Sequence, residues 1–400
     1  MPAFATRSAR PARRAVTVGC LAAVAMLLAA CAGGSDDSVS SAAPSPSEAA
    51  GTHHHGTGAP ARRVPLRDGE QRLTVTMPEP YTPSAPNGTG TDDYRCFLLD
   101  PALQDDMFVT GTDVLPGNPG VVHHVILFRV PPVQVAQARR LDEEADGEGW
   151  TCFGGTGLGV GAELDDAPWL GGWAPGGHES VLRSGYGVPL AAGSQIIMQV
   201  HYNLLAGTDP DESATRLRVA DGSADLQPVT TMLLPAPVEL PCRPGHDEGP
   251  LCDRDAALAD VKERFGEEAG STADWLHLLC PASVTGPVQS CTQTVHRPLT
   301  IIGAAGHMHL LGRSISIEVN PDTPRAKTIL DIDVWDFDNQ GARPITPVRL
   351  EEWDQVRVTC EHSQELRDLL PAFDGQPERY VVWGEGTTDE MCLGILQVAG

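Results

Sequence analysis

The sequence predicts an all-β protein made of two domains that follow an export signal and a polar tether. A chain of 400 residues is longer than one hydrophobic core usually spans, which favours two domains of ordinary size. Its 42 glycines and 34 prolines, with only 5% aromatic residues, are typical of loop-rich β structure. Beyond the tether, short β-type runs alternate with turn signals, and this pattern favours sandwiches or barrels.

Strands and helices can be placed from the spacing of apolar residues. We expect a domain boundary near residue 229, which gives an N-terminal domain at 73–229 and a C-terminal domain at 230–400. Charge-rich helical patterns at 133–144 and 253–268 are expected to decorate loops. The runs that predict strands are 72–76, 121–130, 194–202, 215–219, 299–302, 314–319, 356–359 and 380–383.

Residues 1–31 have the features of a lipoprotein signal peptide. Arginines near the start precede an apolar run at 15–30, and residues 28–31 read Leu-Ala-Ala-Cys, which resembles a bacterial lipobox. We expect lipidation of Cys31, removal of the residues before it, and an extracytoplasmic protein anchored to the bacterial cell membrane. An uncleaved transmembrane anchor is the alternative. An Arg-Arg pair at 13–14 leaves the twin-arginine export route open beside the general secretory route.

A flexible tether is expected at 32–72, where Ser, Pro, Gly and Ala dominate and few large apolar residues could enter a core. It contains His53, His54 and His55, which could bind a metal ion loosely or belong to a merely polar tract. The formal net charge of −25 argues against nucleic acid as a partner, because a phosphate backbone must be met by clustered Lys and Arg. We expect membrane contact only through the anchor at Cys31.

Eight cysteines remain after Cys31, and an even number in an exported chain predicts disulfide bonds. No two of them have the Cys-x-x-Cys spacing of a zinc knuckle or a thioredoxin-like redox site. The eight are Cys96, Cys152, Cys242, Cys252, Cys280, Cys291, Cys360 and Cys392.

Two adjacent histidines lie within the apolar run 121–130. In a regular strand neighbouring side chains point to opposite faces, so either His123 or His124 would enter the core without a reason. A metal at a strand irregularity, where both rings can turn to one side, supplies that reason. His201, which shares a face of its run with Gln199, carries weight only in the company of other histidines.

His307 and His309 flank Met308, and a spacing of two places both imidazoles on one face of a strand, close enough to bind one ion. The same His-x-His spacing occurs in zinc enzymes and cupins, so it indicates a metal better than it indicates which metal. Met391, taken alone, is typical of a core residue. As a ligand, its soft thioether would favour Cu(I) over zinc, calcium or magnesium.

Together these motifs resemble the copper type II ascorbate-dependent monooxygenases, a family that includes the peptidylglycine α-hydroxylating and dopamine β-monooxygenases. The likeness runs from about residue 75 to the C-terminus and includes the segments 93–96 and 173–176. The four motifs are, in chain order, His123-His124, Gln199-Val200-His201-Tyr202, His307-Met308-His309 and the Thr-Thr-Asp-Glu-Met-Cys of 387–392.

This resemblance implies two jelly-roll-like β-sandwich domains that hold two copper ions across an open, solvent-filled cleft. The implied reaction hydroxylates a C–H bond of a small-molecule substrate with O2 and with ascorbate or an equivalent reductant. Tyr94 and Gln199 are candidates for contacts behind the ligands, with plain packing as the alternative for each. The ligands implied are His123, His124 and His201 for the electron-storing copper, and His307, His309 and Met391 for the catalytic, oxygen-activating copper.

Two disulfides are implied in the same way, Cys360 with Cys392 and Cys96 with Cys152. The other four cysteines leave three connectivities open.

The substrate is expected to differ from that of the peptide-amidating branch of the family. That branch binds a peptide carboxylate through an arginine two residues before His-x-His and through an asparagine and a tyrosine after Met-Cys. The matching residues here are Ala305, Leu393 and Ile395, which cannot pair with a carboxylate. We therefore expect a small, largely neutral substrate. A copper storage or delivery protein without turnover, on the same fold, is the alternative function.

Overall fold

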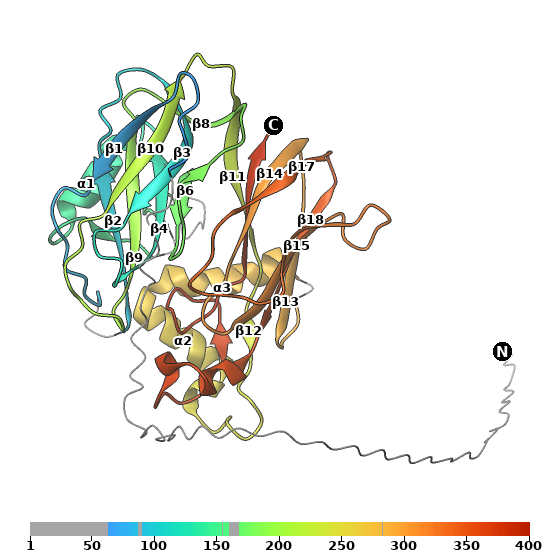
Figure 1. Cartoon of the computed structure of the whole chain (residues 1–400). Helices are drawn as coiled ribbons and strands as arrows, with labels where there is room; N and C mark the ends of the chain where they lie inside the picture. Colours follow the sequence, from blue (N-terminus) through green and yellow to red (C-terminus); the bar gives the residue numbers. More distant parts are fainter. Residues whose placement is uncertain (1–62, 87–89, 154, 160–167, 282) are drawn as a thin grey trace, which may run out of the picture. The chain divides into compact units, whose positions relative to one another are not determined.

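The computed structural model describes residues 63–400 except 87–89, 154, 160–167 and 282. The expected signal peptide, the lipidation site Cys31 and the tract His53 to His55 lie outside the described residues. Within the described part the chain forms mostly β-sheets, which confirms the all-β prediction (Figure 1). None of the helices in this part has the length and apolar character needed to span a bilayer.

The first sandwich packs two sheets around a core that contains Val125, Leu127, Met198 and Leu217. One sheet has the strand order β5 (Trp150–Thr151), β2 (Asp92–Leu99), β9 (Gln195–Asn203), β4 (Val122–Val130) and β6 (Trp169–Trp173). The facing strands are β1 (Gln71–Thr76), β10 (Ala214–Asp221), β3 (Met107–Leu115) and β8 (Tyr186–Leu190), with β7 (Ser180–Val181) paired to β3.

The second sandwich repeats this arrangement around a core that contains Ile301, Ile317, Val358 and Leu396. One layer has the order β11 (Gln227–Pro235), β20 (Leu393–Ala399), β14 (Leu299–His307) and β17 (Arg343–Leu350). The other has the order β13 (Val288–Thr294), β18 (Gln355–His362), β15 (Gly312–Val319) and β16 (Lys327–Ile332), and a small separate ladder joins β12 (Glu239–Leu240) to β19 (Val381–Val382).

Strand β11 connects the two sandwiches. At Gln227 and Pro228 it pairs in parallel with β8, and from Val229 to Pro235 it pairs antiparallel with β20. One nine-stranded sheet therefore continues from the first sandwich into the second. The expected boundary at residue 229 falls inside this strand.

The burial of individual strands follows their sequence patterns. In β15, Ile315, Ile317 and Val319 are buried and alternate with less buried polar residues, as in a sheet with one face on the core. Strand β9 is buried along nearly its whole length, which is typical of a central strand covered on both faces. Each of the eight runs that predicted a strand overlaps one, namely β1, β4, β9, β10, β14, β15, β18 or β19, although β19 covers only two of the four residues 380–383.

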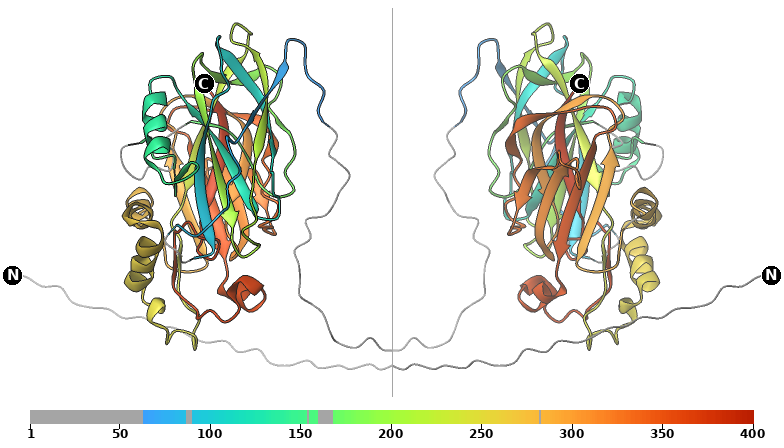
Figure 2. Two further views of the ribbon diagram at one scale, coloured as in Figure 1. Left: turned by 90° about the vertical axis from the view of Figure 1, so that its left-hand side faces the viewer. Right: turned by 90° about the vertical axis from the view of Figure 1, so that its right-hand side faces the viewer.

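The helices differ from the prediction in one region. Helix α1 (Val135–Glu144) lies in the expected segment 133–144, but the segment 253–268 is divided between α2 (Arg254–Phe265) and α3 (Glu267–Leu279). The break falls at Gly266, whose φ of 92° lies in the left-handed region that favours glycine. Both helices lie below the strands of the first sandwich in the view of Figure 1, and Figure 2 shows them beside the lower part of the sheets.

We had expected this segment only to decorate a loop, and this was wrong. Ala257, Leu258 and Val261 of helix α2 enter the core of the second sandwich. Three short 3-10 helices complete the described part: η1 (Pro250–Cys252), η2 (Gln364–Asp368) and η3 (Pro371–Phe373).

The first sandwich begins slightly before the expected end of the tether at residue 72. Strand β1 starts at Gln71, and the Glu70 carboxylate, just before it, accepts a hydrogen bond of 2.7 Å from the Thr110 hydroxyl and pairs with the buried guanidinium of Arg218. A buried ion pair of this kind holds the start of the chain's first strand against the sheet.

All eight cysteines after Cys31 are paired. The structure confirms both implied disulfides and selects one of the three open connectivities for the rest. The pairs are Cys96 with Cys152, Cys360 with Cys392, Cys242 with Cys252, and Cys280 with Cys291.

Candidate metal centre

A β-bulge explains how two adjacent histidines come to share one face of a strand. In the pairing of β4 with β9, Val122 lies opposite Tyr202 and His124 lies opposite His201, so the register shifts between them and His123 is the extra residue. The side chains on both sides of the bulge, Val122 and Val125, belong to the core. Both histidines are therefore turned away from the core, to the side where His201 also lies. This is the strand irregularity that the sequence predicted.

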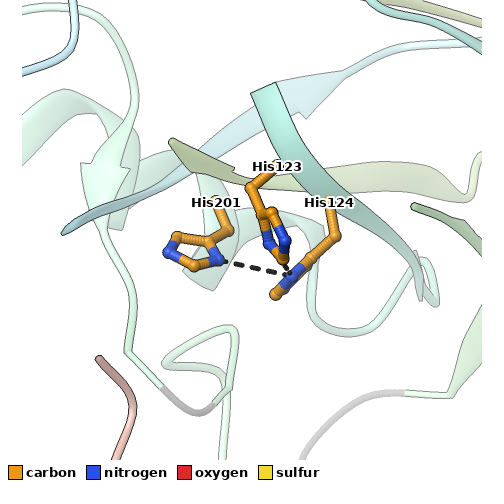
Figure 3. Close-up of side chains that lie close together, drawn as sticks. All are labelled: His123, His124 and His201. Atoms are coloured by element: carbon orange, nitrogen blue, oxygen red, sulfur yellow. Dashed lines mark hydrogen bonds between the residues drawn. The ribbon is translucent and has the colours of Figure 1, made fainter. Parts of the chain in front are cut away.

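The three imidazoles converge through the same ring atom (Figure 3). The Nδ1 atom of His124 lies 3.3 Å from Nδ1 of His123 and 3.3 Å from Nδ1 of His201. The three residues form a group whose ligand atoms all lie within 4.8 Å of one another, a spacing at which one metal ion can be bound. The structure thus brings together all three histidines predicted for the first copper.

The protonation of this group suits a metal. Burial, together with the neighbouring histidines, holds the pKa of His123 and of His124 well below the usual range, so both rings are neutral. The Nε2 atom of His201 lies 2.8 Å from Oδ1 of the buried carboxylate of Asp92. A carboxylate at this position keeps the ring proton on Nε2 and leaves the Nδ1 lone pair for a ligand.

Of the two residues proposed to lie behind these ligands, one does so. The ring of Tyr94 stacks on that of His201 with centroids 4.1 Å apart and an angle of 10° between the planes. The side-chain amide of Gln199 instead donates to the carbonyl of Cys152 at 2.9 Å. Gln199 therefore fastens the loop after β5, and its described hydrogen bonds reach no histidine.

The second group begins where β14 ends. His307 is the last residue of that strand, Met308 is fully buried in the core, and the ring centroids of His307 and His309 are 5.1 Å apart. Burial lowers the pKa of His307 to about 3 and also lowers the pKa of His309, so both rings are neutral. Nδ1 of His307 lies 2.7 Å from the amide oxygen of Gln340, which leaves Nε2 as its free lone pair.

Met391 lies near this group because the end of β14 is paired with the start of β20. The two strands are antiparallel, and the last pair of their ladder joins His307 to Leu393, two residues after Met391. The buried carboxylate of Glu390 joins the two, because its Oε2 accepts hydrogen bonds from the backbone N–H of His309 at 3.0 Å and of Met391 at 3.2 Å. The structure thus brings the backbone of Met391 close to that of His309, and Met391 and His307 line the same cavity.

Several nitrogens of the two groups lie buried without a hydrogen-bond partner among the described residues. They are both ring nitrogens of His309 and Nε2 of His123. A buried polar atom without a partner is costly, and a bound metal ion would satisfy one of the two nitrogens of His309. The available donors are neutral imidazoles and one thioether, with no thiolate, since every described cysteine is in a disulfide. This donor set fits copper.

The two groups lie closer together than the open, solvent-filled cleft of the resemblance implies. The ring centroids of His124 and His307 are 5.6 Å apart, edge to face. The ring of Phe337 stacks on His123 at 4.2 Å and lies 6.3 Å from His309. Aromatic rings therefore lie between the two groups where the resemblance implied solvent.

Beside the two groups lies a cavity of about 450 Å³. Residues of both sandwiches line it, among them His124, His307 and Met391. No Lys or Arg side chain is among its described lining residues. The three residues at the positions of the family's carboxylate clamp, Ala305, Leu393 and Ile395, all lie in its wall.

The sequence analysis did not find the residues that position these histidines and Met391. Asp92 holds His201, and Glu390 holds the backbone of His309 and Met391. His362 is fully buried, with Nε2 3.2 Å from the carbonyl oxygen of Met391. The only sequence signal for the two carboxylates was their position beside the motif residues at 93 and 391. An isolated histidine such as His362 gives no signal, because only the fold brings it next to Met391.

Comparisons with known proteins leave the chain without an assigned family. No protein-family model matches it, and no curated protein matches it. A subviral particle of infectious bursal disease virus VP2 is 9% identical over 82% of this chain and 72% of its own, with a TM-score of 0.18. The coconut allergen cocosin is 9% identical over 82% and 85%, with a TM-score of 0.13. A variant of Bacillus subtilis oxalate decarboxylase is 8% identical over 84% and 78%, with a TM-score of 0.14. Likenesses of this strength carry no argument about the site or its chemistry.

Proposed function

We propose that this chain is a copper-dependent monooxygenase that hydroxylates a C–H bond of a small, largely neutral substrate with O2 and an ascorbate-like reductant. One observation carries the proposal: a three-histidine group and a second group of two histidines and a methionine border the same apolar cavity. The proposal is supported further by the resemblance of these motifs to the ligand motifs of the copper type II ascorbate-dependent monooxygenases.

The chain's own residues would prepare each site for copper. His123, His124 and His201 would hold one ion, and His307, His309 and Met391 the other. Copper, when bound, supplies one-electron chemistry toward O2. A thioether is a ligand that Cu(I) prefers and that zinc, calcium and magnesium do not, so Met391 is the residue that selects the metal.

The protein's part in the reaction is orientation and exclusion of water. Asp92 keeps the proton of His201 on Nε2, and the stacked ring of Tyr94 fixes the plane of that imidazole. Gln340 keeps the proton of His307 on Nδ1, because its amide oxygen accepts a hydrogen bond there. The cavity presents apolar side chains such as Leu393 to a substrate. These side chains would limit the access of water to a substrate bound beside the histidines. No side chain is required as a general base.

We propose further that the protein acts outside the cytoplasm, tethered to the bacterial membrane by a lipid at Cys31. The four disulfides support an oxidising compartment, where such bonds form and persist.

The test is incorporation of isotopically labelled O2 into product. The copper-loaded chain is incubated with ascorbate, labelled O2 and a panel of small uncharged aromatic and aliphatic compounds. We expect one labelled oxygen in a hydroxylated product, and none in the metal-free chain or without ascorbate. Tight copper binding without any labelled product would contradict turnover and support a storage or delivery role instead.

A further inference from the structure

The carboxylate of Asp92 receives hydrogen bonds from both halves of the chain. Its Oδ1 accepts from Nε2 of His201 at 2.8 Å, and from the backbone N–H and the hydroxyl of Thr387 at 3.1 and 2.5 Å. Its Oδ2 accepts from the Thr91 hydroxyl at 2.7 Å. The group is a buried carboxylate shared between His201 and Thr387.

Thr387 belongs to the segment 384–391, which ends in Met391. This segment is fastened at several points. The Tyr94 hydroxyl donates to the carbonyl of Glu385 at 2.9 Å, and Asp389 forms a two-pronged ion pair with Arg264 at 2.7 and 2.8 Å. The segment therefore contacts Tyr94 and Asp92, the two residues that hold His201, and it carries the proposed ligand Met391.

We propose that Thr387 is a positioning residue for the first copper site, acting on His201 through Asp92. This inference rests on the proposed function, since it assumes that His201 is a copper ligand. Thr387 sets how strongly Asp92 attracts the Nε2 proton, and it links that interaction to the segment that carries Met391. The electron-storing site is thus tuned by a residue of the opposite sandwich.

The physical reason is competition for one oxygen atom. Each hydrogen bond that Oδ1 accepts from Thr387 disperses negative charge that would otherwise act on the N–H of His201. Without the Thr387 hydroxyl, Asp92 becomes a stronger acceptor, and the His201 ring becomes a more basic ligand. A more basic imidazole stabilises Cu(II) more than Cu(I).

The experiment compares three substitutions in the full chain: Thr387→Val, Thr387→Ser and Thr388→Val. Valine keeps the shape of threonine and removes only the hydroxyl, and serine restores the donor. Thr388 is the matched control, because it is the next residue of the same segment and makes none of the bonds to Asp92. Each of the three substitutions is made in a chain that also carries His309→Ala, so that copper binds only at the first site. The series is repeated with His307→Ala in place of His309→Ala.

The measurement is the affinity of the first site for Cu(II) and for Cu(I), with the electron paramagnetic resonance spectrum of the Cu(II) form. For Thr387→Val we expect the ratio of Cu(II) to Cu(I) affinity to rise roughly tenfold, which corresponds to a fall in potential of about 59 mV for one electron. The spectrum should change with it. Thr387→Ser and Thr388→Val should keep the ratio and the spectrum of the parent.

A ratio in Thr387→Val within threefold of the parent, or an equal shift in Thr388→Val, would overturn the proposal. Thermal unfolding of each metal-free variant shows whether the fold is kept. Absence of copper binding at the first site of the parent would instead count against the proposed function, so the two failures are distinguishable.

Discussion

Replacing Met391 with isoleucine should abolish hydroxylation while the protein still folds. Met391 packs against the core of the second sandwich, and isoleucine nearly keeps its volume, so the free energy of unfolding should fall by less than about 1.5 kcal/mol. The substitution removes the only sulfur donor of the second group. Loss of residues behind a ligand commonly costs 10–100-fold, so loss of the ligand itself should lower Cu(I) affinity there by at least about 100-fold.

The matched control is Met198→Ile. Met198 is fully buried in the first sandwich, on the opposite face of β9 from His201, and it does not line the cavity. The Met198→Ile protein should retain both coppers and full turnover. Cu(I) affinity is measured by competition with a colorimetric chelator, and turnover by labelled product. Unchanged affinity and turnover in Met391→Ile would make Met391 a core residue and nothing more.

Peptides with a C-terminal glycine should be poor substrates compared with uncharged compounds of similar size. The cavity wall holds Ala305, Leu393 and Ile395 where a carboxylate clamp would be needed, and no Lys or Arg is among its described lining residues. Burying a carboxylate without a partner costs several kcal/mol, which corresponds to at least roughly 100-fold in kcat/KM.

The measurement is kcat/KM for a glycine-extended peptide beside an uncharged aromatic or aliphatic compound that lacks an amine. A substitution of Ala305 by arginine offers a gain-of-function control, because a cation at this position should narrow the difference in favour of the peptide. A clear preference of the unaltered chain for the peptide would contradict the apolar cavity as the substrate site.

The sequence predicted those parts of the site that depend on strand periodicity. Adjacent His123 and His124 in an apolar run required an irregularity, and the structure has a bulge there. The spacing of His307 and His309 predicted a shared face, and it also accounts for the core position of Met308 between them. Two disulfides followed from the family resemblance, and they are present.

Other features depend on contacts that no local pattern records. Helix α3 was missed because its buried face includes Ala269, Thr272, Ala273 and Leu276, of which only Leu276 is a large apolar residue, so the apolar signal is weak. The hydrogen bond from Thr387 to Asp92 joins residues 295 positions apart. The contact between the rings of His124 and His307 depends on how two sandwiches meet, which is set by tertiary packing.

The copper content of the chain tests the central claim most directly. The chain is prepared from the residue after Cys31 with His53 to His55 deleted, loaded with copper, freed of excess metal, and measured by elemental analysis against protein concentration. The two groups described here predict two copper ions per chain, falling to one when His123 and His124 are replaced by alanine. Binding of one copper or none by the chain with all six ligands intact would contradict the two-site scheme.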